Sequence, residues 1–214
     1  MYKLKSQSVL FYGMQKEYSQ ISDTIAPATF DPNAKGSLVT LSNGNLTLTH
    51  SSSGTDNSTY SQLTRSSPLG SKFYIEIKVD TYAGGGNDLG IGIDSVNTST
   101  GTYFYSAATG YAYYFNGQKW NNNSGAAYGN SYTTGDVIGI AIDMVNRYIY
   151  FSKNGTWQNS GDPTSGATGT GKAYTFTAGT YYIAVNTAGA SVCTANFGVT
   201  AFAYSIPSGY IGTW

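Results

Sequence analysis

Apolar and polar residues alternate in short runs along most of the chain, which is the pattern of β-strands that bury one face. The clearest run is SKFYIEIKVD at 71–80, where every second side chain from Phe73 to Val79 is apolar. Turn-forming clusters separate it from similar runs at 37–50, 88–94, 110–120, 135–155 and 179–198. No segment of useful length has a helical period. These patterns predict an all-β protein, built as an antiparallel β-sandwich.

The run GDVIGIAIDMVNRYIYFSKNG predicts a hairpin with strands near 137–143 and 147–152, joined by a short turn. Asp136 and Asp143 fall at opposite ends of its first strand, roughly 20 Å apart at about 3.3 Å per residue. Paired carboxylates of glycosidases need to be about 5–9.5 Å apart. The two aspartates are therefore predicted to stabilise turns and not to act together in catalysis.

Four aromatic residues fall at positions where we expect side chains that point into the core, namely Trp120, Phe151, Phe197 and Phe202. The single cysteine, Cys193, excludes an intrachain disulfide and a cysteine-based zinc site. It lies in the alternating stretch ASVCTANFG, where a free cysteine is expected to be a small buried apolar residue.

The low charge of the chain excludes two classes of binding partner. Charged residues make up 10% of the 214 residues, with 11 basic and 11 acidic side chains. Binding to nucleic acid needs clustered Lys and Arg, and Arg65 and Arg147 are the only arginines. We therefore expect neither nucleic acid nor an anionic membrane as a partner. Without a stretch of transmembrane length or a recognisable signal peptide, we expect synthesis in the cytosol and no membrane insertion.

Residues 1–27 lead into the Pro- and Gly-containing sequence APATFDPNAKG and are neither strongly periodic nor rich in turns. We interpret them as an N-terminal arm or docking segment, separate from a domain at 28–214. Six apolar residues of the arm are candidates for docking onto a neighbouring subunit: Leu4, Val9, Leu10, Phe11, Tyr12 and Met14.

The remaining polar residues give little support to catalysis. The stretch EIKVD places Glu76, Lys78 and Asp80 on one face of a strand. Sandwich glycoside hydrolases carry Glu-x-Asp-x-Glu on such a strand, but here a lysine replaces the middle carboxylate. We expect exposed cross-strand charges and keep a glycan-active hydrolase as an alternative. The only histidine, His50, is predicted to be exposed at the edge of a loop.

Four stretches occur in an order and spacing that resemble the SPRY domain family: FYIEIKV, LGIGI, GDVIGIAIDMVNRYIYFSKNG and ANFGVTAFAYSIPSGY. The resemblance covers roughly residues 28–214. It implies a concanavalin-like β-sandwich of the jelly-roll type, whose activity is binding without a cofactor. The upstream TFDPNAKGSLVTLSNGNLTLTH resembles the opening of SPRY domains in bacteriophage and prophage virion proteins, with Phe30 where tryptophan is usual.

The hairpin topology also predicts a binding surface. The segments 121–136 and 153–171 must emerge side by side, and both are rich in Asn, Tyr or Trp, which suit adaptable contacts. The candidate surface consists of Asn121, Asn122, Asn123, Tyr128, Tyr132, Trp157, Gln158 and Asn159. The alternative is that these segments are only solvated turns.

Together these features predict a non-enzymatic phage virion structural protein without cofactor or metal, located in the virion as part of a homo-oligomer or larger assembly. Residues 1–27 would dock onto other virion proteins, and the loops would contact a host-surface protein or glycan. One alternative is a capsid or tail decoration subunit that only packs against its neighbours. Another is a cellular protein-interaction adaptor, which the Asn-, Thr- and Gly-rich composition disfavours.

Overall fold

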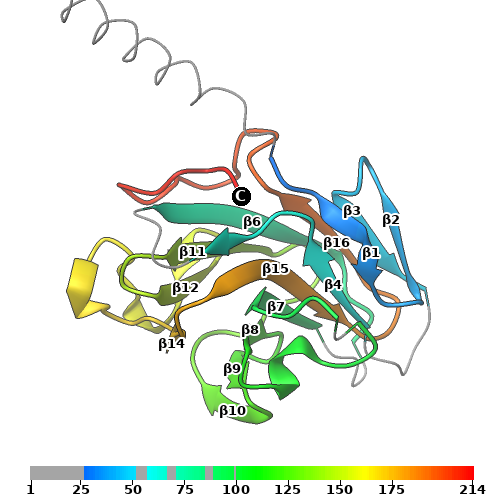
Figure 1. The fold of residues 1–214 in the computed structure, drawn as a ribbon, viewed down its shortest axis with the longest axis horizontal. Helices are drawn as coiled ribbons and strands as arrows, with labels where there is room; N and C mark the ends of the chain where they lie inside the picture. The colour runs from blue at the N-terminus through cyan, green and yellow to red at the C-terminus, as the bar shows by residue number, and fades with distance from the viewer. Residues whose placement is uncertain (1–26, 52–56, 67–70, 85–88, 99) are drawn as a thin grey trace, which may run out of the picture.

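The computed structural model describes residues 27–51, 57–66, 71–84, 89–98 and 100–214, which form a sandwich of two sheets (Figure 1). One sheet contains, from edge to edge, β1 (Phe30–Lys35), β4 (Asn57–Ser61), β15 (Thr180–Thr187), β7 (Leu89–Asp94), β8 (Gly110–Tyr114), β9 (Gln118–Asn121) and β10 (Ser124–Ala127), with β5 (Arg65–Ser66) also paired to β15. We call it the β15 sheet.

The other sheet contains, in order, β13 (Thr156–Trp157), β12 (Tyr148–Lys153), β11 (Val137–Asp143), β6 (Lys72–Thr81), β16 (Val192–Asn196), β3 (Thr47–His50) and β2 (Val39–Ser42), with β14 (Tyr174–Thr175) also paired to β12. We call it the β6 sheet. The described residues contain only three short 3₁₀ helices, η1 (Phe104–Ser106), η2 (Gln158–Ser160) and η3 (Gly166–Thr168). Because the paired strands are antiparallel, the predicted sandwich is confirmed.

The space between the sheets is filled by the side chains that the alternation predicts to point inward. Every second residue of β6 from Phe73 to Val79 is buried there, against apolar residues of β7, β8 and β15. Phe151, Phe197 and Cys193 are fully buried in the same core, as predicted. Within the described part of the chain, no helix is long and apolar enough to span a membrane.

Strands β11 and β12 form the predicted hairpin, with an aspartate at each end of β11. Asp143 accepts a hydrogen bond from the Asn146 amide at 2.9 Å and pairs with Lys72 at 2.9 Å. Burial alone would raise the pKa of Asp143, but the contacts with Asn146 and Lys72 outweigh it and lower the pKa. Asp136 pairs with Lys153 at 3.1 Å. Both aspartates therefore stabilise the ends of the hairpin, as predicted.

Three predictions about single residues are wrong. Trp120 and Phe202 lie half-buried on the outer faces of the β15 and β6 sheets, and not in the core between them. His50 is 1% exposed, because β3 lies between β2 and β16 and not at an edge. Its Nε2 atom lies 3.1 Å from the side-chain nitrogen of Asn57.

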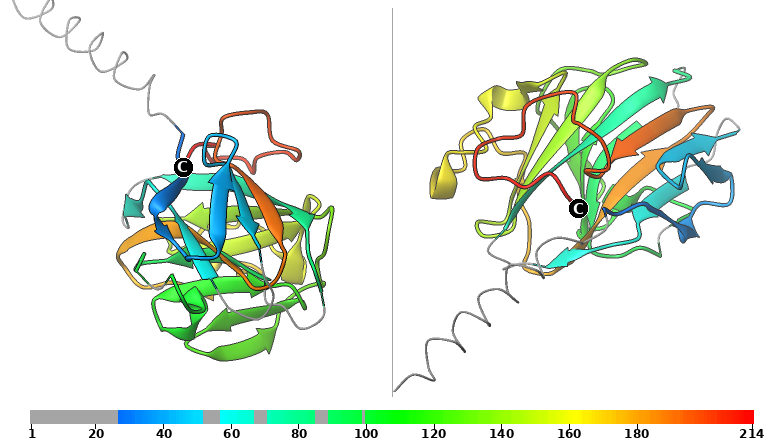
Figure 2. Two further views of the ribbon diagram at one scale, coloured as in Figure 1. Left: turned by 90° about the vertical axis from the view of Figure 1, so that its right-hand side faces the viewer. Right: turned by 90° about the horizontal axis from the view of Figure 1, so that it is seen from above.

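The C-terminal residues return to the sandwich, where they contact Ala28, just before β1, and strand β6. The backbone amide of Ala28 donates a hydrogen bond to the Trp214 carbonyl at 2.8 Å. The Trp214 indole is fully buried and donates to the carbonyl of Leu63 at 3.1 Å. Ile211 forms a bridge to β6. Between β16 and this anchor, residues 199–210 cross the outer face of the β6 sheet (Figure 2).

Candidate functional site

Glu76 holds the crossing segment 199–210 against the β6 sheet. Its carboxylate accepts hydrogen bonds from the amides of Ala203 at 2.7 Å and Tyr204 at 2.9 Å, and from the Tyr74 hydroxyl at 2.9 Å. Glu76 is only 4% exposed. The expectation of an exposed strand residue is therefore wrong, because the returning chain covers the outer face at this point.

Aromatic side chains form a second apolar cluster on this outer face. The alternation that sends Phe73 and Ile75 inward sends Tyr74 outward, where its ring centre lies 5.2 Å from Phe202 and 6.2 Å from Trp157. The cluster is built from Tyr74, Ala141, Tyr150 and Tyr210, with Tyr148, Trp157 and Phe202 packed against it. We call these side chains the outer cluster, and the crossing segment 199–210 packs on it.

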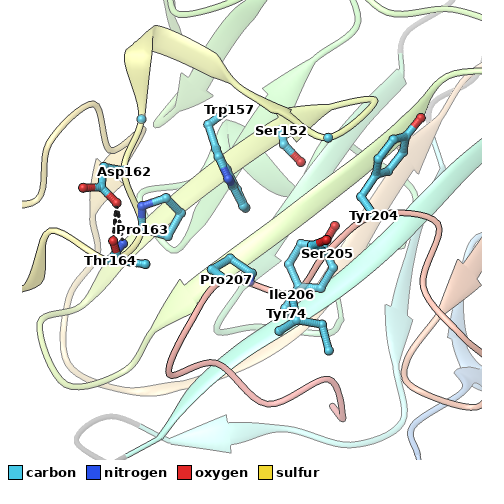
Figure 3. A pocket seen from close by; sticks show the side chains of 12 residues that line it. Tyr74, Ser152, Trp157, Asp162, Pro163, Thr164, Tyr204, Ser205, Ile206 and Pro207 are labelled. Atoms are coloured by element: carbon cyan, nitrogen blue, oxygen red, sulfur yellow. Dashed lines mark hydrogen bonds between the residues drawn. The ribbon is translucent and has the colours of Figure 1, made fainter.

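A groove of about 470 Å³ lies on the outer cluster, between residues 161–164 on one side and 204–207 on the other (Figure 3). Tyr74 and Trp157 line it between these two walls. The walls are tied together by the Tyr210 hydroxyl, which donates a hydrogen bond to the Pro163 carbonyl at 3.1 Å.

Gly155 lines the groove next to the ring of Tyr204. Its φ of +78° favours glycine, and a β-carbon there would lie 2.5 Å from that ring. Pro163 and Pro207 stand on opposite walls (Figure 3). The groove is therefore bounded by aromatic rings and by prolines with restricted backbones.

Among the described residues that line the groove, Asp162 is the only charged one. Its Oδ1 atom accepts hydrogen bonds from the Thr164 hydroxyl at 2.6 Å and from the Thr164 amide at 2.8 Å. These two bonds lower the pKa of Asp162 below its ordinary value. The carboxylate is therefore ionised at neutral pH.

The chemistry of the groove suits binding. Its described lining holds one carboxylate and no histidine or cysteine, whereas acid–base catalysis by carboxylates uses a pair with separated pKa values. On β6, Lys78 pairs with Asp80 at 2.7 Å, and Glu76 bonds the returning chain. Among the described residues, no group of three or more His, Cys, Asp or Glu could hold a metal ion.

The two segments of the predicted binding surface do lie side by side. Lys153 donates a hydrogen bond to the Ser131 carbonyl at 2.8 Å, and the Asn130 amide donates to Gln158 at 2.8 Å. Gln158 is nevertheless 3% exposed, so it joins the two segments and cannot reach a partner.

Tyr128 and Tyr132 of the predicted surface are also buried, at 6% and 2% exposure. The Tyr132 hydroxyl donates to the Leu89 carbonyl at 3.0 Å, and the Tyr128 hydroxyl accepts from the Phe151 amide at 3.2 Å. Both rings belong to the core between the sheets. Replacing them with serine would open the core, so neither Tyr128 nor Tyr132 is available as an exposed contact.

The other members of the predicted surface lie on different faces. Asn121, Asn122 and Asn123 lie at the β9–β10 turn, and Asn123 joins a small hollow with Trp120 on the β15 sheet. Trp157 lies in the groove on the β6 sheet. Asn159 is exposed in η2. The structure therefore separates these residues, and whether any of them contacts a partner stays a prediction.

Sequence reasoning found Trp157 but missed the rest of the groove. An outward-facing aromatic residue at the centre of a sheet, Tyr74 beside Glu76, was the available signal that another segment covers this face. The candidate docking residues of the arm, Leu4, Val9, Leu10, Phe11, Tyr12 and Met14, lie outside the described residues.

A family model described as the SPRY domain matches residues 72–200, which is more than half of the chain. The chain therefore belongs to the SPRY domain family, as its four ordered motifs indicated, but the stretch 29–50 that resembles bacteriophage SPRY domains lies outside the matched residues. The crystal structure of the SPRY domain of human HERC1 has a TM-score of 0.60 and 19% identity, and covers 78% of this chain and 96% of that one. That likeness supports the fold.

Curated relatives carry the same domain within longer proteins. Ran-binding protein 9 of Xenopus tropicalis is 27% identical over 204 residues, which cover 88% of this chain and 33% of the relative. The Ran-binding proteins 9/10 homolog of Drosophila melanogaster is 28% identical over 145 residues, which cover 63% of this chain and 14% of the relative. This chain thus spans a third or less of the length of these relatives.

These relatives correct the predicted function. They are cellular proteins of animals, so the prediction of a phage virion protein, with a virion location and with virion or glycan partners, is wrong. The Asn-, Thr- and Gly-rich composition was wrongly taken to disfavour a cellular protein. Such a composition reflects β-strands and turns and does not distinguish a cellular protein from a viral one. SPRY domains are typically non-catalytic modules for protein interaction.

Proposed function

We propose that this chain is the protein-interaction module of a cellular protein, and that it binds a short segment of a partner protein in the groove between residues 161–164 and 204–207. The observation that carries this proposal is a groove whose walls are already held in place. The Tyr210 hydroxyl joins one wall to the other, and Glu76 holds Ala203 and Tyr204 against the β6 sheet. A preformed site spares the free energy of ordering loops on binding.

The lining supports the same proposal. Aromatic residues are enriched at protein interfaces, and the half-buried rings of Trp157 and Tyr204 both line the groove. A volume of about 470 Å³ is within the range of ligand pockets. This volume accommodates a few side chains of an extended segment, but it is too small to hold an element of a folded protein.

The names of the relatives suggest one intact partner. They are Ran-binding proteins, so Ran is the first folded protein to test for binding to this chain. The groove adds a separate statement, namely which face of the domain a partner segment contacts. Binding of intact Ran to the full chain tests the first statement, and binding of peptides to the groove tests the second.

The groove is tested by selecting a display library of random peptides on the full chain. We expect the selected peptides to bind Trp157→Ala about tenfold more weakly, because a central tryptophan is a typical hot spot. The matched control is Trp120→Ala, which removes a half-buried tryptophan from the opposite sheet. Thermal unfolding verifies that both variants are folded. Peptides that bind the Trp157 variant as tightly as wild type would contradict the proposal.

A further inference from the structure

Asp162 differs from other aspartates near the β6 sheet because it has no cationic partner among the described residues. Three others each pair with a lysine, as Lys72–Asp143, Lys78–Asp80 and Lys153–Asp136. Within the part of the chain that the structure describes, Asp162 forms no such pair, and only its Oδ1 atom accepts hydrogen bonds, both from Thr164. The groove therefore carries one negative charge that the described chain does not neutralise.

The three aromatic rings that line the groove, those of Tyr74, Trp157 and Tyr204, also lack a cation from the described ranges. Two rings of the outer cluster beneath the groove, which do not line it, each carry a lysine: Lys172 lies 4.6 Å from the centre of Tyr148, and Lys72 lies 5.5 Å from the centre of Tyr210. No described Lys or Arg lies over Trp157, and none lines the groove. An unneutralised carboxylate and an open indole ring in one groove complement the same group, a cation on a long apolar stem.

We propose that the groove takes a basic residue of the partner segment, arginine or lysine, with its charged end at Asp162 and its stem along Trp157. The inference rests on the proposed function and names the chemistry of the partner at that site. Arginine fits best, because its planar guanidinium can stack on an indole ring while its N–H groups reach a carboxylate. Acidic or uncharged segments are the alternative occupants, and the test separates them.

The first test is the composition of the peptides that depend on Trp157. We expect arginine and lysine to be enriched in peptides selected by the wild-type chain, and aspartate and glutamate to be enriched in those selected by Asp162→Lys. Finding no peptide that depends on Trp157 would contradict the proposed function. Finding such peptides without basic enrichment would leave the proposed function standing and overturn this inference.

The second test removes the charge and keeps the shape. In one selected peptide, arginine is replaced by citrulline, which is nearly isosteric and neutral, and binding is measured by fluorescence anisotropy. We expect wild type to lose about two- to fivefold in affinity, and Asp162→Asn to lose almost nothing. The side-chain oxygen of the asparagine in that variant can still accept both hydrogen bonds from Thr164, so the local turn is kept.

The matched control for the second test is Asp31→Asn. Asp31 accepts a hydrogen bond from the backbone amide two residues ahead, as Asp162 does, but lies on β1 in the other sheet. This variant should respond to citrulline as wild type does. An equal loss in wild type and in Asp162→Asn would show that the basic residue binds somewhere other than Asp162.

Discussion

Asp94, at the end of β7, shows how burial governs a single side chain. It is 1% exposed and receives hydrogen bonds from the Val96 amide at 3.2 Å and, weakly, from the Tyr60 hydroxyl at 3.4 Å. Burial raises the pKa of Asp94 to about 6, although the hydrogen bonds act in the opposite direction. The folded state therefore binds a proton more tightly than the unfolded chain does.

We expect Asp94→Asn to remove a pH-dependent loss of stability. Between about pH 4 and pH 6 the unfolded chain loses this proton before the folded protein does, so wild-type stability falls as the pH rises. The full loss, on the order of 3 kcal/mol for a shift of this size, is present above about pH 6. Urea unfolding of both proteins at pH 4, 5, 6 and 7 should show the difference in stability changing in favour of asparagine.

The control for this prediction is Asp31→Asn, which removes the same charge from a half-exposed position. It separates the effect of losing one negative charge from the effect of burying one. A constant difference between wild type and Asp94→Asn at all four pH values would mean that Asp94 titrates alike in the folded and unfolded states.

At the scale of the strand, the two-residue period determines which side chains are buried. A comparison of β12 with residues 199–210 shows that this rule applies within a strand and not outside it. Phe151 lies within β12 and is fully buried, with its ring stacked at 5.5 Å on Tyr113 of the other sheet. Phe202 lies outside any strand and is half-buried against Tyr74. The sequence placed both in the core, but only the one inside a strand is there.

We therefore expect Phe151→Ala and Phe202→Ala to differ in their effect on stability. Truncating a fully buried phenylalanine costs about 3–5 kcal/mol, enough to unfold a marginal domain. Phe202→Ala should cost about 1 kcal/mol, because only part of its surface leaves water. Denaturant midpoints measure both. Similar losses would mean that the returning chain contributes as much to the core as β12 does.

At the scale of the whole molecule, the domain is closed by contact between residues far apart in sequence. The buried Trp214 packs edge-to-face on Phe73 at 5.4 Å and donates hydrogen bonds to Ser61 and Leu63. The Ala28 amide bonds the Trp214 carbonyl. The last residues therefore support the start of β6, the strand at the centre of its sheet.

We expect two terminal deletions to have opposite outcomes. Removing residues 211–214 should unfold the domain or lower its unfolding free energy by about 3–5 kcal/mol, because it removes a buried tryptophan. Removing residues 1–26 should change that free energy by less than about 0.5 kcal/mol, since Ala28 and its contacts remain. Urea unfolding followed by circular dichroism measures both. Unfolding after the N-terminal deletion would show that the segment is an integral part of the fold.

The sequence by itself determined the features that depend on local period and on motif order. Alternation predicted the facing of β6 and the burial of Phe151 and Cys193. The β11–β12 hairpin followed from its turn residues. These predictions succeed because successive side chains of a strand point to opposite faces whatever surrounds the strand. The ordered motifs likewise indicated the SPRY domain family.

Only the tertiary structure decided what covers the outer faces of the sandwich. Alternation shows that Tyr74 and Glu76 point away from the core, but not that residues 199–210 return over them and form one wall of a groove. It also gives no direction for side chains in loops, so the buried Tyr128 and Tyr132 were taken for exposed contacts. Such contacts join segments far apart in the chain, and the free energy gained depends on surface that exists only once both segments are in place.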